Sequence, residues 1–122
     1  MSDLNKQENS TNSPSEFEAK RDERAREIQH SKGKLTVTER INLMVDEGSF
    51  EEIDQLVTSK ENPEGEAVVT GRALIHGRPV YLFSEDFSVM GGSLGKVVSE
   101  KIVKVMDLAL ENKVPIIGIK DS

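Results

Sequence analysis

The segment "FSEDFSVMGGSLGK", residues 83–96, decides how this chain folds. An apolar run ends at Phe83, an acidic pair follows, and Gly91 and Gly92 then lead into a helix that is expected to begin near Ser93. Two glycines at such a junction let the backbone approach another group closely, because they carry no Cβ. The segment therefore predicts a strand-to-helix turn in which backbone amides converge.

The residues on either side of this turn predict a strand, a helix and a second strand. Before it, "EAVVTGRALIHGRPVYLFS" (residues 66–84) is rich in β-forming residues, and His76-Gly77 suits a tight hairpin turn. After it, apolar residues recur at helical spacing from Leu94 to Leu110. "VPIIGIKDS" (residues 114–122) then has the pattern of a buried parallel strand. This order of elements indicates an α/β fold.

Two helices are predicted ahead of this unit. Ser15 and Glu18 have capping-box spacing before a charged helical stretch, and Thr36 and Glu39 repeat that spacing before a shorter helix. The first fifteen residues are rich in Ser, Asn and Pro and hold almost nothing that a core could use. We therefore expect a disordered tail over 1–15, a helical region over 16–58 and a further domain that begins at residue 59.

Composition excludes several classes of function. The chain has 122 residues, enough for one domain, and its net charge of −6 argues against a nucleic-acid partner. No segment approaches the ~18 apolar residues that span a bilayer, so no membrane partner is expected. The absence of cysteine removes thiolate nucleophiles and cysteine-ligated zinc, and it fits the reducing cytoplasm, where we expect the protein.

A collinear series of motifs between residues 29 and 122 resembles the opening of a known family. The motifs are "QHSKGKLTVTERINLMVDEGSFEEID", "VVTG", "IHGRPVYLFSEDFSVMGGSLG", "KIVKVMDLAL" and "VPIIGIKDS". They are similar to the carboxyltransferase subunit of biotin-dependent acyl-CoA carboxylases, of the propionyl-CoA carboxylase β-chain and methylmalonyl-CoA carboxyltransferase type. Members of that family continue past "DS" with Gly-Gly-Ala-Arg. The chain thus resembles an N-terminal fragment, in which residues 59–122 are the truncated start of a crotonase-like (ClpP/crotonase) domain.

The resemblance implies a function. Members of the family transfer a carboxyl group from carboxybiotin to the α-carbon of an acyl-CoA, such as propionyl-CoA or acetyl-CoA. No covalently bound cofactor is implied, since biotin arrives as a co-substrate on a carrier protein. The implied partners are an acyl-CoA, the biotin carboxyl carrier or biotin carboxylase subunit, and further copies of the subunit. The alternative is a non-catalytic remnant or split-gene product that binds CoA weakly or pairs with a full subunit.

The resemblance also implies roles for five residues. Gly91 and Gly92 become candidates for backbone donors to the thioester oxyanion, or for residues that shape its site. Without the resemblance, a plain strand-to-helix turn would be the favoured interpretation of both. Lys32, Lys34 and Arg40 lie in the "KGKLT…ER" motif and are candidates to bind the phosphates of CoA. A structural role for these three, docking the N-terminal helices on the core, is about equally favoured.

The remaining polar residues give weaker signals. Glu85 and Asp86 are expected in an exposed acidic loop, because this chemistry does not require a protein carboxylate. His30 and His76 have no partners at the spacing of a metal site or a catalytic triad, so roles at a helix end and in a turn are favoured. No metal site is predicted.

Overall fold

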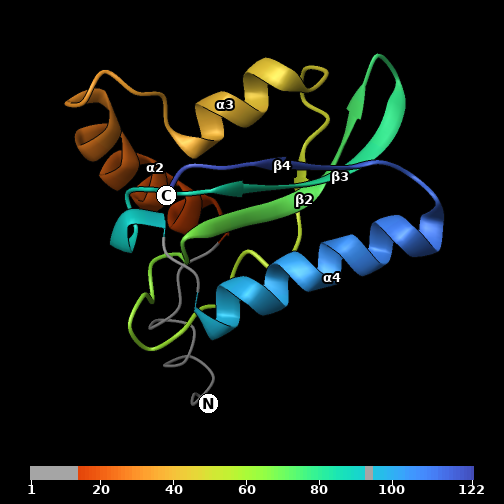
Figure 1. Ribbon diagram of the computed structural model, residues 1–122. Helices are drawn as coiled ribbons and strands as arrows, with labels where there is room; N and C mark the ends of the chain where they lie inside the picture. Colours follow the sequence, from red (N-terminus) through yellow and green to blue (C-terminus); the bar gives the residue numbers. More distant parts are fainter. Residues whose placement is uncertain (1–13, 93–94) are drawn as a thin grey trace, which may run out of the picture.

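A computed structural model of the chain describes residues 14–92 and 95–122 (Figure 1). It contains three helices, a short 3-10 helix and a four-stranded sheet with the strand order β1-β2-β3-β4. The helices are α2 (Pro14–His30), α3 (Val37–Met44), η1 (Met90–Gly92) and α4 (Lys96–Asn112), and the strands are β1 (Glu51–Glu52), β2 (Val68–Ile75), β3 (Arg78–Glu85) and β4 (Ile116–Ile119). β3 and β4 are parallel, whereas the other neighbours are antiparallel. The predicted α/β fold and its strand–helix–strand unit are confirmed.

The sheet lies between two helical layers. In Figure 1, α3 crosses one face and α4 runs along the other. Alternate residues of β2 and β3 point to opposite faces, as the period of two requires, and supply two separate cores. The core under α3 contains Val37, Ile41, Val45, Val69, Ala73, Val80 and Leu82, and the core under α4 contains Ala67, Val68, Val89 and Val98.

The hairpin between β2 and β3 forms where the sequence predicts it. His76 and Gly77 both have positive φ, 51° and 76°, which is the conformation of a type I′ turn. Both of their amides donate to the carboxylate of Asp46, at 2.8 and 2.7 Å. The loop after α3 thus holds the turn in place.

Both predicted N-terminal helices are present; the start of α3 agrees with the prediction, and that of α2 does not. α3 has Thr36 as its N-cap and a complete capping box with Glu39, as predicted. α2 already includes Ser15, so the spacing of Ser15 and Glu18 does not mark its start. The described part of α2 begins at Pro14, which is the first residue that the structure describes.

Other expectations need correction or fall outside the described residues. The region 16–58 is not helical throughout, since β1 lies within it and pairs with β2. β4 is parallel to β3 as predicted but is not buried, because it forms one edge of the sheet. Most of the predicted tail lies outside the described residues, as do Ser93 and Leu94; the helix that follows begins at Lys96. Within the described residues, no helix has the length and apolarity needed to cross a bilayer.

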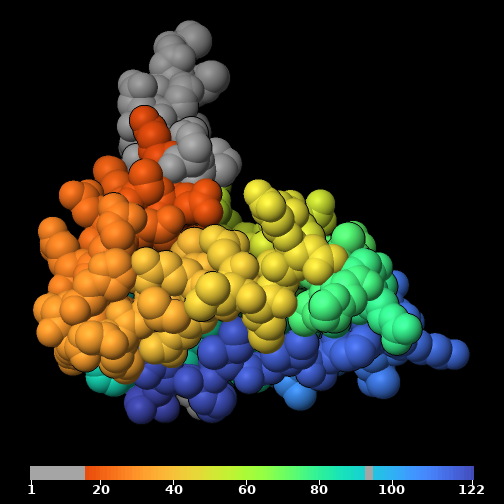
Figure 2. Space-filling view, turned by 90° about the horizontal axis from the view of Figure 1, so that it is seen from above, coloured from red at the N-terminus to blue at the C-terminus, as the bar shows by residue number. Residues whose placement is uncertain are grey.

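α2 packs through one narrow face. Its buried residues Phe17, Arg21, Ala25 and Gln29 recur at intervals of four, which places them along one side of a helix. Half of this face is polar, so α2 is held by hydrogen bonds and ion pairs as much as by apolar contact. Figure 2 shows the blue C-terminal segment bordering the orange end of α2 and the yellow α3.

Candidate functional site

The candidate site lies at the carboxyl ends of the parallel strands β3 and β4. In α/β sheets this edge is where ligands bind. The chain leaves β4 here and reaches Asp121, which lies beside the glycine turn that follows β3. A Cβ built on Gly92 would collide with the carbonyl oxygen of Asp121. Only glycine at position 92 permits this approach of the two backbones.

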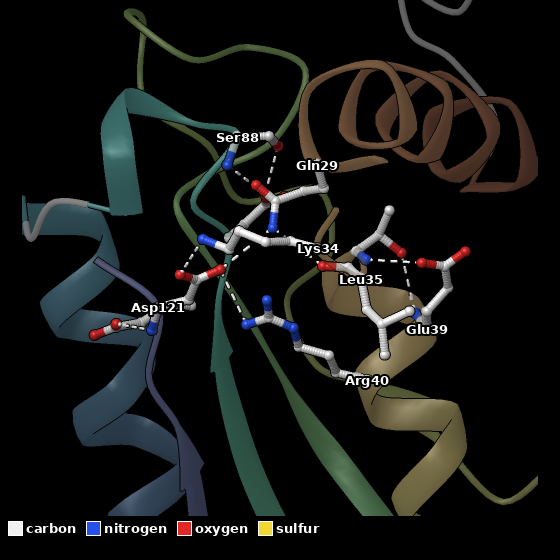
Figure 3. A network of polar contacts seen from close by, with 10 residues as sticks. Gln29, Lys34, Leu35, Glu39, Arg40, Ser88 and Asp121 are labelled. Carbon is white, nitrogen blue, oxygen red and sulfur yellow. Dashed lines mark hydrogen bonds and ion pairs between the residues drawn. The ribbon is translucent and has the colours of Figure 1, made fainter. Parts of the chain in front are cut away.

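The carboxylate of Asp121 binds three side chains from the N-terminal region (Figure 3). Lys34 Nζ donates to Oδ1 at 2.7 Å, and Arg40 Nη1 lies 2.9 Å from Oδ2. Gln29 Nε2, from the end of α2, donates to Oδ2 at 3.3 Å. Partial burial acts to raise the pKa of Asp121, but the hydrogen bond from Lys34 and the charges of Arg40 and Lys34 prevail and lower it. Asp121 is thus held as a carboxylate.

Lys32, Lys34 and Arg40 were predicted either to bind phosphate or to dock the N-terminal helices. The structure brings Lys34 and Arg40 together on Asp121, which joins the α2–α3 region to the end of β4. Lys32 does not join that cluster. It is exposed, and its Nζ lies 4.6 Å from the centroid of the Phe87 ring, whose face Lys34 also approaches at 4.1 Å. Phosphate binding by these three residues stays a prediction. Of the three, only Lys32 has no contact with Asp121 among the described ion pairs; its ammonium group lies over the Phe87 ring instead.

Glu85 and Asp86 are buried, so the expectation of an exposed acidic loop is wrong. Glu85 Oε1 accepts the backbone amide of Asp121 at 2.7 Å, and Glu85 Oε2 lies 2.6 Å from Lys120 Nζ. Asp86 accepts hydrogen bonds from both the backbone amide and the hydroxyl of Ser88. Each carboxylate is turned inward because it satisfies backbone donors at the end of a strand, where regular sheet bonding stops.

The two glycines of the turn differ in what they offer. Gly91 and Gly92 have φ of 65° and 71°, and Met90 before them also has a positive φ, of 48°. The amide of Gly92 donates to the carbonyl of Val89 at 2.8 Å, which closes the 3-10 turn. With its amide engaged and no room for a Cβ, Gly92 here shapes the turn. The role of Gly91 and Gly92 at an oxyanion stays a prediction.

The histidines lie where their expected structural roles place them. His30, at the end of α2, has its Nε2 2.9 Å from Oε1 of Glu39, the capping-box residue of α3. His76 lies in the hairpin turn. Across residues 14–92 and 95–122, no group of three or more histidine or acidic side chains is arranged to hold a metal ion.

Sequence reasoning missed the centre of this site. Sequence patterns place Asp121 only at the end of a strand and Gln29 only at the start of a family motif. A signal was present, because Lys34, Arg40 and Asp121 all lie in motifs shared with the family. Their contact depends on how α2 and α3 fold back over β4, which no local pattern in the sequence encodes.

Comparison with known proteins supports the motif analysis. Residues 28–122 match the carboxyl transferase domain family. The chain is 50% identical over 104 residues to the propionyl-CoA carboxylase beta chain of Roseobacter denitrificans, covering 79% of this chain and 20% of that protein. It is 46% identical over 106 residues to the mitochondrial propionyl-CoA carboxylase beta chain of Homo sapiens, with the same coverage. The chain thus spans about a fifth of the length of the curated relatives it matches.

Solved structures give the same result for the fold. A crystal structure of transcarboxylase 12S with hydrolysed methylmalonyl-coenzyme A bound superposes with a TM-score of 0.74 at 41% identity, covering 82% of this chain and 21% of that one. The crotonase-like fold class expected from the resemblance is confirmed. With the match over residues 28–122, these similarities establish that the chain belongs to the carboxyl transferase domain family.

Proposed function

We propose that this segment forms part of a carboxyltransferase that moves a carboxyl group from carboxybiotin to the α-carbon of an acyl-CoA such as propionyl-CoA. The observation that carries the proposal is the family membership of residues 28–122, supported by 41% identity to a transcarboxylase crystallised with hydrolysed methylmalonyl-coenzyme A. In the reaction a C–N bond of carboxybiotin breaks, a C–C bond forms at the α-carbon, and the α-proton passes to the biotin nitrogen.

In this chemistry the glycine turn would stabilise negative charge on the substrate. As the α-carbon loses its proton, negative charge develops on the thioester oxygen, and preorganised backbone donors stabilise that charge. The turn of Met90–Gly92 stands at the carboxyl end of β3, and the N-terminus of α4 follows it, with Gly95 as its N-cap. The positive end of a helix dipole favours a developing anion nearby. Gly91 is our preferred candidate for contact with the substrate, because the Gly92 amide already binds Val89.

Lys32 is our candidate for a contact with the phosphates of CoA. Its side chain is exposed and rests against the Phe87 ring, one residue after Asp86 at the end of β3. An ammonium group on a flexible stem can reach a mobile phosphate as a point charge. The proposed partners of the complete subunit are a biotin carboxyl carrier that delivers carboxybiotin, and further copies of the subunit; no covalently bound cofactor is proposed.

The test uses a complete subunit in which this sequence occupies the first fifth. Carboxyl transfer from free carboxybiotin to propionyl-CoA should exceed the rate without enzyme, and Lys32→Gln should raise the KM for propionyl-CoA several-fold at unchanged kcat. Lys113→Gln serves as a matched control, because Lys113 is also exposed but lies at the far end of α4. Absence of transfer in the unmodified subunit would refute the proposed function, whereas an unchanged KM would refute only the role of Lys32.

A second candidate role is pairing with a carboxyltransferase polypeptide, and one surface favours it. Lys104, on one flank of α4, binds Asp54 just after β1 at 2.9 Å, so that flank lies toward β1. The opposite flank, toward β4, carries the exposed side chains of Val103, Met106 and Leu110. β4 is itself an edge strand of apolar residues and glycine.

A strand followed by a helix, supplied by another carboxyltransferase chain, would fit this surface. Such a unit adds a strand to β4 and lays an apolar helix face beside α4. Mixing this chain with a relative that lacks its first fifth should give a complex of defined mass in sedimentation velocity. Leu110→Lys should weaken that complex, whereas Leu43→Lys, an equally exposed leucine on α3, should not.

A further inference from the structure

We propose that Asp121 is a positioning residue of the carboxyltransferase, and that Lys34 and Arg40 act through its carboxylate rather than on the substrate. In this role Asp121 fixes the backbone that leaves β4 against the Gly91–Gly92 turn. The inference rests on the proposed function for its kinetic consequences, but the contacts that carry it belong to this chain alone.

The carboxylate and the backbone amide of Asp121 are engaged by different parts of the chain. Its carboxylate binds Lys34, Arg40 and Gln29, which come from the α2–α3 linker, α3 and the end of α2. Its amide donates to Oε1 of Glu85, the last residue of β3, at 2.7 Å. Three parts of the chain that are far apart in sequence therefore meet at one residue: residues 29–40, the end of β3 and the end of β4.

The backbone of Asp121 also limits the glycine turn. Its carbonyl oxygen occupies the space that a side chain at position 92 would need. The amide of Gly92 donates a hydrogen bond of 2.8 Å to the carbonyl oxygen of Val89. Movement of Asp121 would therefore displace the carbonyl oxygen that packs against Gly92 and would let the glycine turn shift. Active-site groups need such support, since displacement of a reacting group by about 1 Å can cost about a hundredfold in rate.

Charge balance argues against direct binding of phosphate by Lys34 and Arg40. Both cations already contact a carboxylate, at 2.7 and 2.9 Å. An approaching phosphate would meet the negative charge of Asp121 between them and would have to compete with it for the same donors. Lys32, by contrast, contacts an aromatic ring that offers no competing anion charge.

The two interpretations predict opposite results for Asp121→Asn in the complete subunit. If Lys34 and Arg40 bind phosphate, loss of the competing carboxylate should lower the KM for propionyl-CoA. If Asp121 positions the turn, kcat should fall by about ten- to a hundredfold, and the KM should stay within twofold. Lys104→Gln is the matched control, because it breaks another 2.9 Å ion pair, to Asp54, on the far side of α4.

Conservative and non-conservative replacements of the two cations separate charge from packing. Lys34→Arg and Arg40→Lys retain a cation for the Asp121 carboxylate and should retain at least half of the wild-type kcat. Lys34→Gln and Arg40→Gln should each reproduce the loss of kcat seen with Asp121→Asn. Equal losses in the conservative and the non-conservative variants would overturn the proposal.

Amide hydrogen exchange in the 122-residue chain tests the same contacts without any activity. In the Lys34→Gln/Arg40→Gln double variant, the amides of Asp121 and Gly92 should exchange at least tenfold faster than in the wild type, and the amide of Val105 in α4 should not change. Unchanged exchange at Asp121 and Gly92 would overturn the proposal, whatever the complete subunit does. Faster exchange together with no carboxyl transfer in the unmodified subunit would instead refute the proposed function and leave the positioning contacts standing.

Discussion

Arg21 and Glu52 are joined by two hydrogen bonds, of 2.7 and 2.9 Å, that link the middle of α2 to β1. Both side chains are almost fully buried, with 4% and 9% of their surfaces exposed. Burial acts to lower the pKa of Arg21, but the hydrogen bonds and charge of Glu52 prevail and raise it. Arg21 therefore stays charged, and its contact with Glu52 is the main polar attachment of α2 to the sheet.

Arg21→Met should lower the free energy of unfolding by about 3–5 kcal/mol, because it leaves the buried carboxylate of Glu52 without its partner. Arg72→Met is the matched control, since the Arg72–Glu51 pair is exposed and 3.8 Å apart. Its loss should cost less than about 1 kcal/mol. Urea unfolding followed by circular dichroism measures both; equal losses would contradict a special role for the buried pair.

Gly118→Ala should destabilise the contact between β3 and β4. Gly118 pairs with Phe83 in the register of the two strands, and a Cβ at position 118 would lie 2.5 Å from the end of the Phe83 ring. We expect a loss of about 1–3 kcal/mol from the forced displacement of the ring. Phe83→Leu in the same chain should recover part of it, since the two residues are in contact. Additive losses in the double variant would show that the ring is not the obstacle.

Gly92→Val in a complete subunit should lower kcat by orders of magnitude while the fold persists. The valine side chain would collide with the Asp121 carbonyl and would also have to adopt a φ of 71°. Gly48 provides a control, because it has a φ of 73° but nothing within 4 Å of a built Cβ. Gly48→Val should cost stability alone. Near-normal kcat in Gly92→Val would remove the glycine turn from the proposed site.

The local features of the fold could be predicted from sequence, because each is encoded within a few residues. The hairpin at His76-Gly77 follows from residues that accept positive φ, and the start of α3 follows from Thr36 and Glu39. The face of α4 was also predictable from its apolar spacing. Buried Val98, Val105 and Ala109 confirm it, although Met106 is half exposed.

The buried polar contacts could not be predicted, because the sequence around a charged residue does not show whether a distant residue will form an ion pair or hydrogen bond with it. Arg21 lies in a stretch that resembles a solvated helix, yet its partner Glu52 is 31 residues away. Glu85 was expected in an exposed loop, but it binds a backbone amide 36 residues further along the chain. Lys101, on the buried face of α4, was missed for the same reason; burial lowers its pKa against the opposing charges of Glu52 and Glu66.

Acidification should release the contacts of Asp121. A carboxyl group whose pKa is lowered in the folded state contributes stability above its unfolded pKa, about 3.9 for Asp, and loses that contribution as the pH falls through the folded value. Wild type should therefore be more stable than Asp121→Asn at pH 6, and the difference should shrink as the pH falls from 4 to 2.5. Urea unfolding at a series of pH values checks this. A difference that does not depend on pH would mean that the charge of Asp121 contributes nothing.

The 122-residue chain by itself should self-associate and should show no carboxyl transfer. The two edges of the sheet differ: β1 is two residues long and consists of glutamates, whereas β4 is formed by Ile116, Ile117, Gly118 and Ile119. Short, charged edges resist pairing with other chains, and uncharged apolar edges favour it. The exposed stripe of Val103, Met106 and Leu110 lies on the same side of the molecule and adds apolar surface.

Light scattering over a range of concentrations measures this association. Val103→Lys/Leu110→Lys should lower the average mass toward that of a monomer, because it places charges beside the β4 edge. Leu43→Lys, which changes an exposed leucine on α3, should leave the mass unchanged. Carboxyl transfer from carboxybiotin to propionyl-CoA should stay at background in all of these variants, since the chain covers about a fifth of its relatives and the Gly92 amide of its turn is already bound to Val89. A monodisperse monomer at high concentration would refute the first expectation, and turnover above background would refute the second.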